Sequence, residues 1–435
     1  VETSGVSVSH LWPSLGNAAL GAGSGKAQTM LNLNWSGNYG HSHYDNASII
    51  LYANGAELLS DIGYTHSKYR GWTLHTASHN TVVIDQKAQD LGTDAKPATG
   101  RLKFYDDQNP HVKAIDIDAS PAYSVAGKYR RRLILVHAAE GRDYVIDRFD
   151  VEGGKTHDWF LHGMCEEEGA LETSIPLNQA VKTLVPEWGG TNVPKNQYES
   201  DIEGKKIHAY SYLKDIKSAP ADKQWIATWR YQHSGMRTHH IPQEGTEIFS
   251  FRAPSVRLAQ EDDNKLDNYM RLGLMQRHSG GKSSFIAVHE PFQNEPWIKS
   301  VRAEGDTYFI RYELNGLNIE DRISLKEDEI DAVSGAGWSY KKGAEQSGSV
   351  KGIEMLAGKW NLELDHDIPE VSHVRFDFPD GATLYYPAKR ISDKGLQLAD
   401  DPGFTMEKNG KIHFYTFPHK EYNGVLRFTV FGSSE

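Results

Sequence analysis

Cysteine is almost absent from this sequence. Cys165 is the only one among 435 residues, so an internal disulfide is excluded and the chain is not a disulfide-stapled scaffold. A sole cysteine beside Met164 is most simply a small core residue, and we expect no reactive role for its thiol.

Long hydrophobic runs are also absent. No stretch of eighteen apolar residues occurs, so the sequence predicts no membrane-spanning helix and no membrane partner. The first residues, VETSGVSVSHLWPSLG, lack the basic start, apolar middle and small-residue cleavage site of a signal peptide, and the sequence does not begin with Met. We therefore expect the chain to begin partway through a longer protein.

Acidic residues outnumber basic ones in this sequence. The formal net charge is -11, which argues against nucleic acid as a partner. The same excess of acidic groups removes the long-range attraction that would draw in a polyanionic substrate. Net charge does not decide a local cleft, however, and Lys68, Arg70 and the arginines at 130–132 supply positive charge locally. The last three alternate sides if they form a strand, so we do not expect a single anion-binding patch there.

The sequence is rich in short β-branched or aliphatic runs with turn residues between them. Such runs predict strands, and the clearest are residues 46–52, 80–84 and 133–136. Residues 140–143 and the Asp-Gly pair at 380–381 predict the tips of two hairpins. Long helical periodicity is absent, and the best helix candidate, residues 176–184, is short.

Length and composition together predict the domain organisation. A chain of 435 residues is expected to hold two or three domains. Residues 332–352 are rich in Gly, Ser and Lys, which indicates the approach to a boundary. We predict an all-β protein, with a large antiparallel β-sandwich at residues 1–342 followed by a smaller C-terminal β-domain at 343–435.

Three short stretches carry the residues with the clearest chemistry: residues 40–46 (GHSHYDN), 59–64 (LSDIGY) and 77–81 (ASHNT). If residues 41–45 are extended, His41, His43 and Asp45 project from one face, with neighbouring side chains roughly 6–7 Å apart. That separation suits two adjacent roles better than one shared role. Two imidazoles and a carboxylate are a common donor set for Zn²⁺. Spacing alone leaves several trios open, His41 with His43 and Asp45 among them, as well as histidines that bind no metal.

All three stretches also carry a family resemblance. The string GHSHYDNASIILYANGAELLSDIGY, followed by ASHNTVVID, resembles the signature of the heparinase II/III-like polysaccharide lyases, a group that includes alginate lyases of related architecture. Two downstream segments resemble the same family's hairpin and a later sandwich strand: residues 129–163 and 284–292. The resemblance covers roughly residues 15–300 and is most specific at 37–85.

The resemblance implies an architecture and a metal site. In that family an N-terminal (α/α) toroid packs against a central antiparallel β-sandwich, which a small C-terminal β-domain follows; this chain is expected to begin near the sandwich, without the toroid. Carried over by motif, His43, Asp61 and His79 occupy the positions of the zinc ligands. His41 matches the sandwich histidine that faces the cleft and is implicated in catalysis. The zinc is expected to be mainly structural, ordering the loops that hold His41 against the sugar.

The chemistry that the resemblance implies is β-elimination at a uronic acid. A base removes the proton next to the carboxylate, the carboxylate is neutralised, and the glycosidic oxygen departs. His41 and Arg70 are candidates to neutralise the carboxylate, and Tyr69 is a candidate helper in catalysis. Asp45 or Asn46 is expected to support the imidazole ligands, and Asn46 is also a candidate sugar contact. The family's principal catalytic Tyr and a further His belong to the toroid.

The prediction is therefore a lyase of an anionic uronate polysaccharide, periplasmic or secreted by family resemblance. Its main alternative is a non-catalytic carbohydrate-binding or structural β-module that retains the metal site. A toroid encoded upstream favours the lyase, and its absence favours the module. A third possibility is a zinc hydrolase that uses metal-bound water. The sequence leaves open which uronate glycan is bound.

Overall fold

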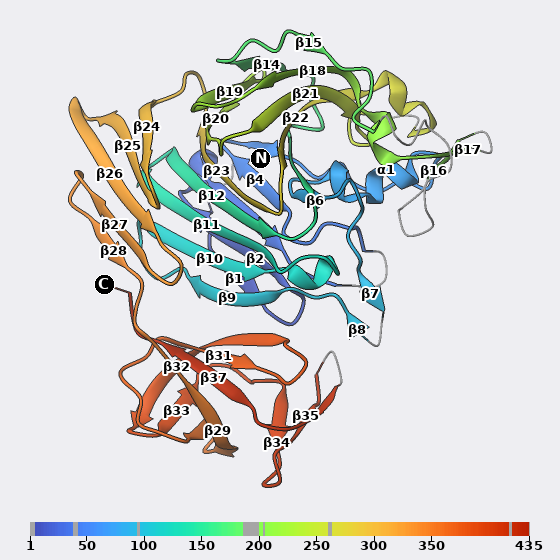
Figure 1. Cartoon of the computed structure of the whole chain (residues 1–435). Coiled ribbons are helices and arrows are strands. Elements are labelled where there is room, and N and C mark those ends of the chain that lie inside the picture. Colours follow the sequence, from blue (N-terminus) through green and yellow to red (C-terminus); the bar gives the residue numbers. More distant parts are fainter. Residues whose placement is uncertain are drawn as a thin grey trace. The chain divides into compact units, whose positions relative to one another are not determined.

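The computed structural model describes residues 5–37, 42–93, 96–185, 200–202, 205–259, 263–416 and 420–434. The chain divides into two compact units: the first contains Val1–Leu11, Asn17–Gly100 and Pro110–Ile298, and the second contains Trp12–Gly16, Arg101–Asn109 and Lys299–Glu435. Strands form nearly all of the regular structure in both units (Figure 1). The predicted all-β class, a large antiparallel sandwich followed by a smaller β-domain, is confirmed.

Two antiparallel sheets form the sandwich of the first unit. Within this unit, the strands of the larger sheet run in the order β14 (Ala170–Thr173), β19 (Trp225–Arg230), β20 (Gly235–Ile241), β23 (Lys282–Phe292), β12 (Arg142–Glu152), β11 (Lys128–Ala139), β10 (Val112–Asp118). The other runs in the order β15 (Gln179–Ala180), β18 (Lys214–Pro220), β21 (Thr246–Pro254), β22 (Met270–Ser279), β13 (Thr156–His162), β6 (Val82–Ile84). Their side chains meet between the sheets: the rings of Trp159 on β13 and Phe285 on β23 lie 5.6 Å apart.

The predicted hairpin at the centre of the larger sheet is confirmed. β11 and β12 pair from Lys128↔Glu152 to Ala139↔Arg142. The turn between them contains Gly141 with φ +70°, a left-handed conformation that glycine adopts without strain. β11 is buried along nearly its whole length, which explains why residues 133–136 are continuously apolar.

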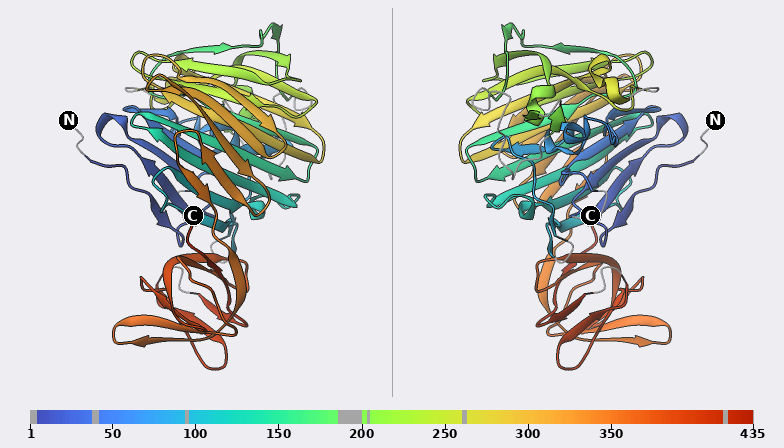
Figure 2. Two further views of the ribbon diagram at one scale, coloured as in Figure 1. Left: turned by 90° about the vertical axis from the view of Figure 1, so that its left-hand side faces the viewer. Right: turned by 90° about the vertical axis from the view of Figure 1, so that its right-hand side faces the viewer.

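A third sheet of the first unit positions the candidate site. Its order is β1 (His10–Trp12), β2 (Asn17–Ala22), β3 (Thr29–Asn34), β4 (Ile49–Ala53), β5 (Ala56–Leu59). Both side views show these blue strands lying side by side (Figure 2). Burial alternates along β3, so Leu31 and Leu33 face the interior while Asn32 and Asn34 lie on the other face.

Helices are few and short in the described residues. The α-helix is α1 (Arg70–Leu74), and the 3₁₀ turns are η1 (Gly25–Ala27), η2 (Thr76–Ser78), η3 (Ser120–Ala122), η5 (Ala209–Tyr212) and η6 (Asp263–Asn268). Two short ribbons accompany them: β7 (Gly92–Thr93) with β8 (Lys96–Pro97), and β16 (Ser200–Ile202) with β17 (Lys205–Ile207). Trp72 anchors α1, because its buried indole N–H donates to the Pro254 carbonyl at 2.9 Å. In the described part of the chain, no helix has both the length and the apolar character needed to cross a bilayer.

The helix considered for residues 176–184 is wrong. The segment contains the two-residue strand β15, which pairs with β18 at Gln179↔Ser218 and Ala180↔Lys217. The next amide, that of Val181, donates to the Ile216 carbonyl at 2.9 Å. Pairing with a distant strand has overridden a weak local preference for helix.

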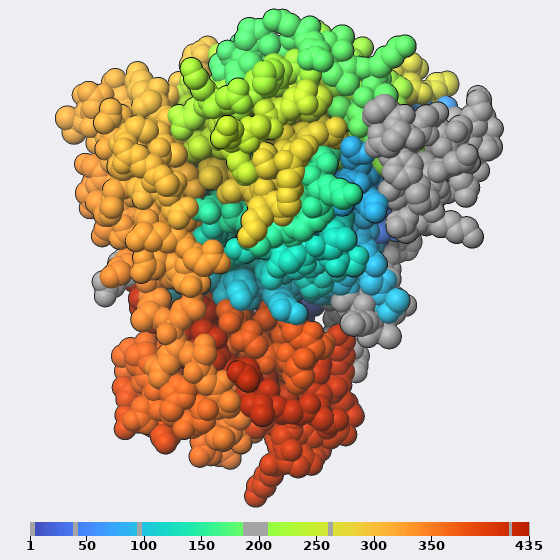
Figure 3. All heavy atoms as spheres, viewed as in Figure 1, coloured from blue at the N-terminus to red at the C-terminus, as the bar shows by residue number. Residues whose placement is uncertain are grey.

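The second unit contains two sheets and a closed barrel. One sheet runs β24 (Ile298–Glu304), β25 (Thr307–Leu314), β26 (Leu317–Leu325), β27 (Ile330–Ser334), β28 (Ser339–Lys341), and a small one runs β34 (Phe404–Met406), β35 (Lys411–Phe414), β36 (Glu421–Asn423). The barrel runs β29 (Glu345–Leu356), β30 (Lys359–Leu364), β33 (Gly395–Leu398), β32 (Thr383–Ser392), β31 (His373–Asp377), β37 (Arg427–Phe431). β9 (Arg101–Asp106) also belongs to this unit. Figure 3 draws the atoms of this part of the chain in orange and red, and on the face shown they form a continuous surface.

The hairpin predicted at residues 380–381 is confirmed within the barrel. β31 and β32 pair from His373↔Pro387 to Asp377↔Thr383, and the Asp380 carboxylate accepts from the Ala382 amide at 2.9 Å to shape the turn. The predicted boundary between residues 342 and 343 falls between β28 and β29. It stays a prediction.

Candidate metal centre and polar groove

Four potential metal-binding side chains meet beside the five-stranded sheet. His43 and Asp45 come from the segment between β3 and β4, Asp61 follows β5, and His79 follows η2. One ligand atom from each of the four lies within 4.8 Å of the others. The structure thus brings together the predicted ligands His43, Asp61 and His79, and it adds Asp45 as a fourth.

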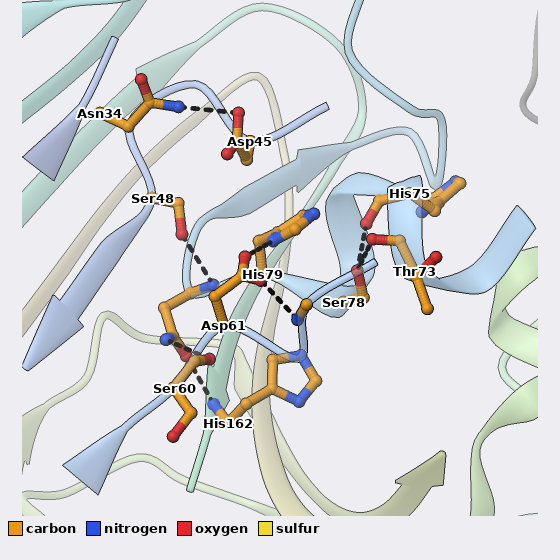
Figure 4. A network of polar contacts seen from close by, with 12 residues as sticks. Asn34, Asp45, Ser48, Ser60, Asp61, Thr73, His75, Ser78, His79 and His162 are labelled. Carbon is orange, nitrogen blue, oxygen red and sulfur yellow. Dashed lines mark hydrogen bonds and ion pairs between the residues drawn. The ribbon is translucent and has the colours of Figure 1, made fainter. Parts of the chain in front are cut away.

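Asp61 and His79 form the tightest pair of the cluster. Nδ1 of His79 lies 2.8 Å from Oδ2 of Asp61, and Figure 4 shows the two side chains pointing toward each other. The Gly63 amide donates to the other carboxylate oxygen of Asp61 at 2.7 Å, which holds that carboxylate in place. Burial alone would raise the pKa of Asp61 and lower that of His79. Their mutual attraction outweighs burial, so the pKa of Asp61 is lowered and that of His79 is raised.

His43 and Asp45 complete the cluster in different electrostatic states. Burial, aided by the nearby charge of His79, lowers the pKa of His43 to about 4, so this imidazole is neutral at pH 7. Burial raises the pKa of Asp45 to about 6, although His79 acts in the opposite direction. Asn34 orients Asp45 by donating from Nδ2 to Oδ1 at 2.7 Å.

This donor set fits a divalent ion. Two imidazoles and two carboxylates from one small site are the nitrogen and oxygen donors that Zn²⁺ accepts in tetrahedral sites. Nε2 of His79 is buried and makes no hydrogen bond, so one polar atom of the cluster lacks the partner that buried polar atoms normally have. The chemistry of the described residues therefore matches a bound metal better than a closed hydrogen-bond network.

Tyr64 is a neighbour of this cluster that the sequence analysis did not single out. Its ring stacks on His43, with centroids 5.8 Å apart and an interplanar angle of 16°. The Arg70 guanidinium lies 4.7 Å from the centre of the Tyr64 ring and donates to the Tyr64 hydroxyl. The arrangement connects Arg70 to His43 through one aromatic ring. The only sequence signal was the position of Tyr64 at the end of the DIGY string.

The other predicted site residues have different surroundings. His41 lies outside the described residues. Tyr69 is 1% exposed, its hydroxyl donates to Asp267 Oδ2 at 2.7 Å, and burial with this bond raises the pKa of Tyr69 to about 12. Asn46 is fully buried, and its side chain donates to the Ala98 carbonyl at 3.3 Å. These positions give no support to a substrate contact by Tyr69 or Asn46, and their roles stay predictions.

A buried arginine fastens the cluster to the larger sheet. Nη1 of Arg131 donates to the carbonyls of Ala47 at 2.6 Å and Asn80 at 2.5 Å, residues that closely follow the candidate ligands Asp45 and His79. The same guanidinium is paired with Asp147 at 2.5 Å, and neither side chain has any solvent exposure. The equivalent arginines on either side are paired as well, Arg130 with Asp116 and Arg132 with Asp150.

A polar groove opens beside the cluster. It has a volume of about 400 Å³. Its lining includes His43, Asp45 and Asp61 together with the amide side chains of Asn17, Asn32 and Asn34. The candidate metal ligands thus share one surface hollow with hydrogen-bonding groups of the five-stranded sheet.

The structure thus combines an antiparallel β-sandwich with a cluster of potential metal ligands beside it. The model of the C-terminal domain of heparinase II/III-like proteins matches residues 14–270, which is more than half of this chain and includes the whole cluster. The chain belongs to the heparinase II/III-like family. The resemblance found in the sequence is confirmed.

Individual relatives are distant and longer. An alginate lyase of Stenotrophomonas maltophilia (strain K279a) is 24% identical over 283 residues, 58% of this chain and 33% of the relative. A heparinase III gene product of solved structure is 15% identical, with a TM-score of 0.45 over 73% of this chain and 42% of that chain. A mutant of the heparan sulfate lyase HepC from Pedobacter heparinus is 12% identical, with a TM-score of 0.48 over 73% and 43%. The chain spans about a third of the curated relative's length and less than half of each solved chain.

Proposed function

We propose that this chain is the metal-bearing sandwich half of a polysaccharide lyase, which cleaves a uronic-acid-containing glycan by β-elimination. The observation that carries the proposal is the meeting of His43, Asp61 and His79, from three separate segments, inside the region that matches the family. The proposed ion is Zn²⁺, held by these three residues, with Asp45 close enough to be a further ligand.

In this proposal the residues around the cluster have separate roles in catalysis and substrate binding. When bound, Zn²⁺ supplies a crosslink between the ligand-bearing segments. His41, two positions before His43, would help to neutralise the uronate carboxylate, so that a Tyr or His of the toroid can remove the proton on the adjacent carbon. Arg70, held against Tyr64, adds positive charge near the same site and helps to neutralise the carboxylate. Tyr69 as a helper in catalysis and Asn46 as a sugar contact rest on the family resemblance alone, because both side chains are buried.

The proposal also covers a partner domain and a cellular location. An N-terminal (α/α) toroid is the proposed partner of this sandwich, and it supplies the second wall of the cleft with the principal catalytic Tyr and a further His. The substrate is a polysaccharide outside the cytoplasm, so the proposed location is periplasmic or secreted.

The test is turnover by the full-length protein on a panel of uronate glycans, followed by the absorbance of unsaturated uronate. We expect one glycan class to give unsaturated products and His41→Ala to abolish them while the circular dichroism spectrum is unchanged. His233→Ala, which alters an exposed turn of the larger sheet, is the matched control and should retain full turnover. Unsaturated products from none of the glycans, or full turnover by His41→Ala, would contradict the proposal.

A non-catalytic carbohydrate-binding module is the second candidate. The amide-lined groove favours it, because sugar binding there requires neither the toroid nor a catalytic base. This candidate predicts saturable binding of a uronate oligosaccharide with no unsaturated product, even when the full-length protein carries metal. The same glycan panel therefore separates the two.

A further inference from the structure

The groove beside the candidate metal centre has a row of side-chain amides along its wall. Asn17 on β2 is the cross-strand partner of Asn34 on β3, and Asn32 lies two residues from Asn34 on the same face. Ile50 on β4 is the cross-strand partner of Asn32 and also lines the groove. The wall thus combines amides with one aliphatic side chain, the mixture that the hydroxyl groups and C–H faces of a sugar ring require.

The amides of Asn17 and Asn32 are fixed by each other. Asn32 Nδ2 donates to Asn17 Oδ1 at 2.9 Å, and Asn17 Nδ2 donates back to Asn32 Oδ1 at 3.4 Å. Each amide has two N–H donors and two acceptor positions, so each retains one donor and one acceptor after this exchange. Two such groups side by side match two adjacent hydroxyls, each of which also donates and accepts.

Asn34 connects this pair to the metal cluster. Its Nδ2 donates to Asp45 at 2.7 Å, and its Oδ1 accepts from the Ser36 amide at 3.0 Å and the Ser36 hydroxyl at 2.8 Å. Because these bonds use most of its capacity, Asn34 acts as a fixed spacer between Asp45 and the Asn17–Asn32 pair.

The groove offers no cationic side chain to a sulfo group. Among the described residues that line it, two are aspartates, Asp45 and Asp61, and none is lysine or arginine. A sulfo group on either hydroxyl would remove the O–H that donates to an asparagine Oδ1, and it would place sulfate oxygens against that acceptor. The lining therefore suits free hydroxyls and opposes sulfate.

We propose that the groove binds an unsulfated sugar ring through two adjacent hydroxyl groups, which the Asn17–Asn32 pair recognises. The identity of the ligand as a uronate glycan rests on the proposed function. The ring would occupy a position next to the metal centre, and a sulfo group on either of the two hydroxyls would exclude it.

The experiment is isothermal titration of the zinc-loaded full-length protein with two uronate tetrasaccharides of one backbone, unsulfated and O-sulfated. We expect the unsulfated ligand to bind at least about tenfold more tightly, a ratio that one lost hydrogen bond to a charged or buried group accounts for. Asn32→Asp should weaken binding of the unsulfated ligand by about tenfold, with zinc content and thermal midpoint unchanged. Asn17→Ala, which adds no charge, should weaken it in the same direction.

The matched control is Asn361→Asp. Asn361 also belongs to a side-chain amide pair across adjacent antiparallel strands, since Gln397 donates to its Oδ1 at 3.0 Å, but it lies on β30 in the second unit. This variant should bind both ligands as the unaltered protein does. Equal affinity for the two tetrasaccharides, binding of neither, or unweakened binding by both groove variants would overturn the proposal.

The same samples distinguish this proposal from the lyase function. If the unsulfated ligand binds with the expected variant pattern but is never converted to an unsaturated product, the groove proposal holds and the lyase function fails. If product forms while Asn32→Asp and Asn17→Ala leave KM unchanged, the lyase function holds and the groove proposal fails.

Discussion

At the scale of single residues, Asn80 holds the candidate metal ligands at their separation. Its Nδ2 donates to the carbonyls of Ile49 at 2.9 Å and Ser60 at 3.2 Å, and its Oδ1 accepts from the His162 amide at 2.7 Å. Ser60 precedes Asp61, and Asn80 follows His79, so this one amide links the backbones that carry both ligands. The side chain is 1% exposed, and these bonds are therefore made away from water.

Asn80→Asp is expected to destabilise the protein severely. The change keeps the shape of the side chain but replaces two donors with an acceptor that faces two carbonyl oxygens, which should cost about 2–4 kcal/mol of unfolding free energy. Urea denaturation measures the loss. Asn361→Asp, at a half-buried amide pair, should change the unfolding free energy by less than about 0.5 kcal/mol. Similar midpoints for the two variants would show that Asn80 does not hold the ligands as described.

The residues of the candidate cluster could be predicted from the sequence, but their surroundings could not. His43, Asp61 and His79 lie in motif strings that are local in sequence, so the family pattern alone locates them. The burial of Tyr69 depends on Asp267, which is 198 positions away and has no local signal. The stacking of Tyr64 on His43 likewise depends on how two loops meet, and only the folded chain shows it.

At the scale of elements, Arg131 connects the central strand β11 to both ligand-bearing segments. Its charge is matched by Asp147, which also lies 3.2 Å from Nε2 of His289 on β23. A fully buried pair of this kind contributes little net stability, but it is costly to break and specifies one arrangement. Through its bonds to the carbonyls of Ala47 and Asn80, Arg131 fixes where these two residues lie relative to β11.

Arg131→Gln should therefore weaken metal binding as well as stability. The change leaves Asp147 buried without its cation, and we expect a loss of about 3–5 kcal/mol of unfolding free energy. The control is Arg130→Gln on the same strand, which lies on the opposite face from Arg131 and whose partner Asp116 retains slight exposure. Zinc affinity should fall only for Arg131→Gln.

A double variant separates positioning from stability. Arg131→Met with Asp147→Leu removes both charges, so much of the lost stability should return. Zinc affinity should stay low, because the bonds to Ala47 and Asn80 are still missing. Full recovery of zinc affinity by the double variant would contradict the positioning role of Arg131.

Removal of the metal should loosen the ligand segments selectively. If Zn²⁺ binds only the folded chain, saturation at about 100 times its dissociation constant adds about 2.7 kcal/mol of stability, which a chelator removes. Hydrogen exchange should then quicken at residues 42–48, 60–66 and 76–81. The hairpin of β11 and β12 should exchange as before, and added zinc should restore protection. Uniform quickening across both regions would contradict a local crosslink.

The hairpins were predictable from the sequence because the two strands of a hairpin are consecutive and only a short turn separates them. The turns at 140–143 and 380–381 needed only local residue types. β15 was missed because its partner β18 lies more than thirty residues downstream, and a two-residue strand has no periodicity of its own. The barrel order, which places β37 between β29 and β31, likewise depends on long-range pairing.

At the scale of the whole molecule, the family assignment and the all-β class agree with each other. The family match covers residues 14–270, almost all within the first unit, and the second unit is β-sheet as well. The net charge of -11 belongs to the chain as a whole and is not a measure of the charge at the metal cluster or in the groove. Its consequence is weak long-range attraction for any polyanion, so recognition must come from short-range contacts.

Raising the salt concentration should therefore increase the rate at which an anionic glycan associates with the protein. Raising the salt concentration screens the repulsion between a chain of net charge -11 and an anionic oligosaccharide, so association should become faster, not slower. Stopped-flow measurement of the association rate constant between about 10 and 150 mM salt tests this expectation. A steep fall with salt would indicate a basic binding surface that the groove lacks.

The central claim is that one divalent ion joins the segments of His43, Asp61 and His79. Elemental analysis of the purified protein, before and after His43→Ala, tests it most directly. The account predicts about one zinc per chain, a large loss of zinc in His43→Ala, and no loss in the control His233→Ala. Purified protein without stoichiometric metal that also fails to take up added zinc, or equal zinc in all three proteins, would contradict it.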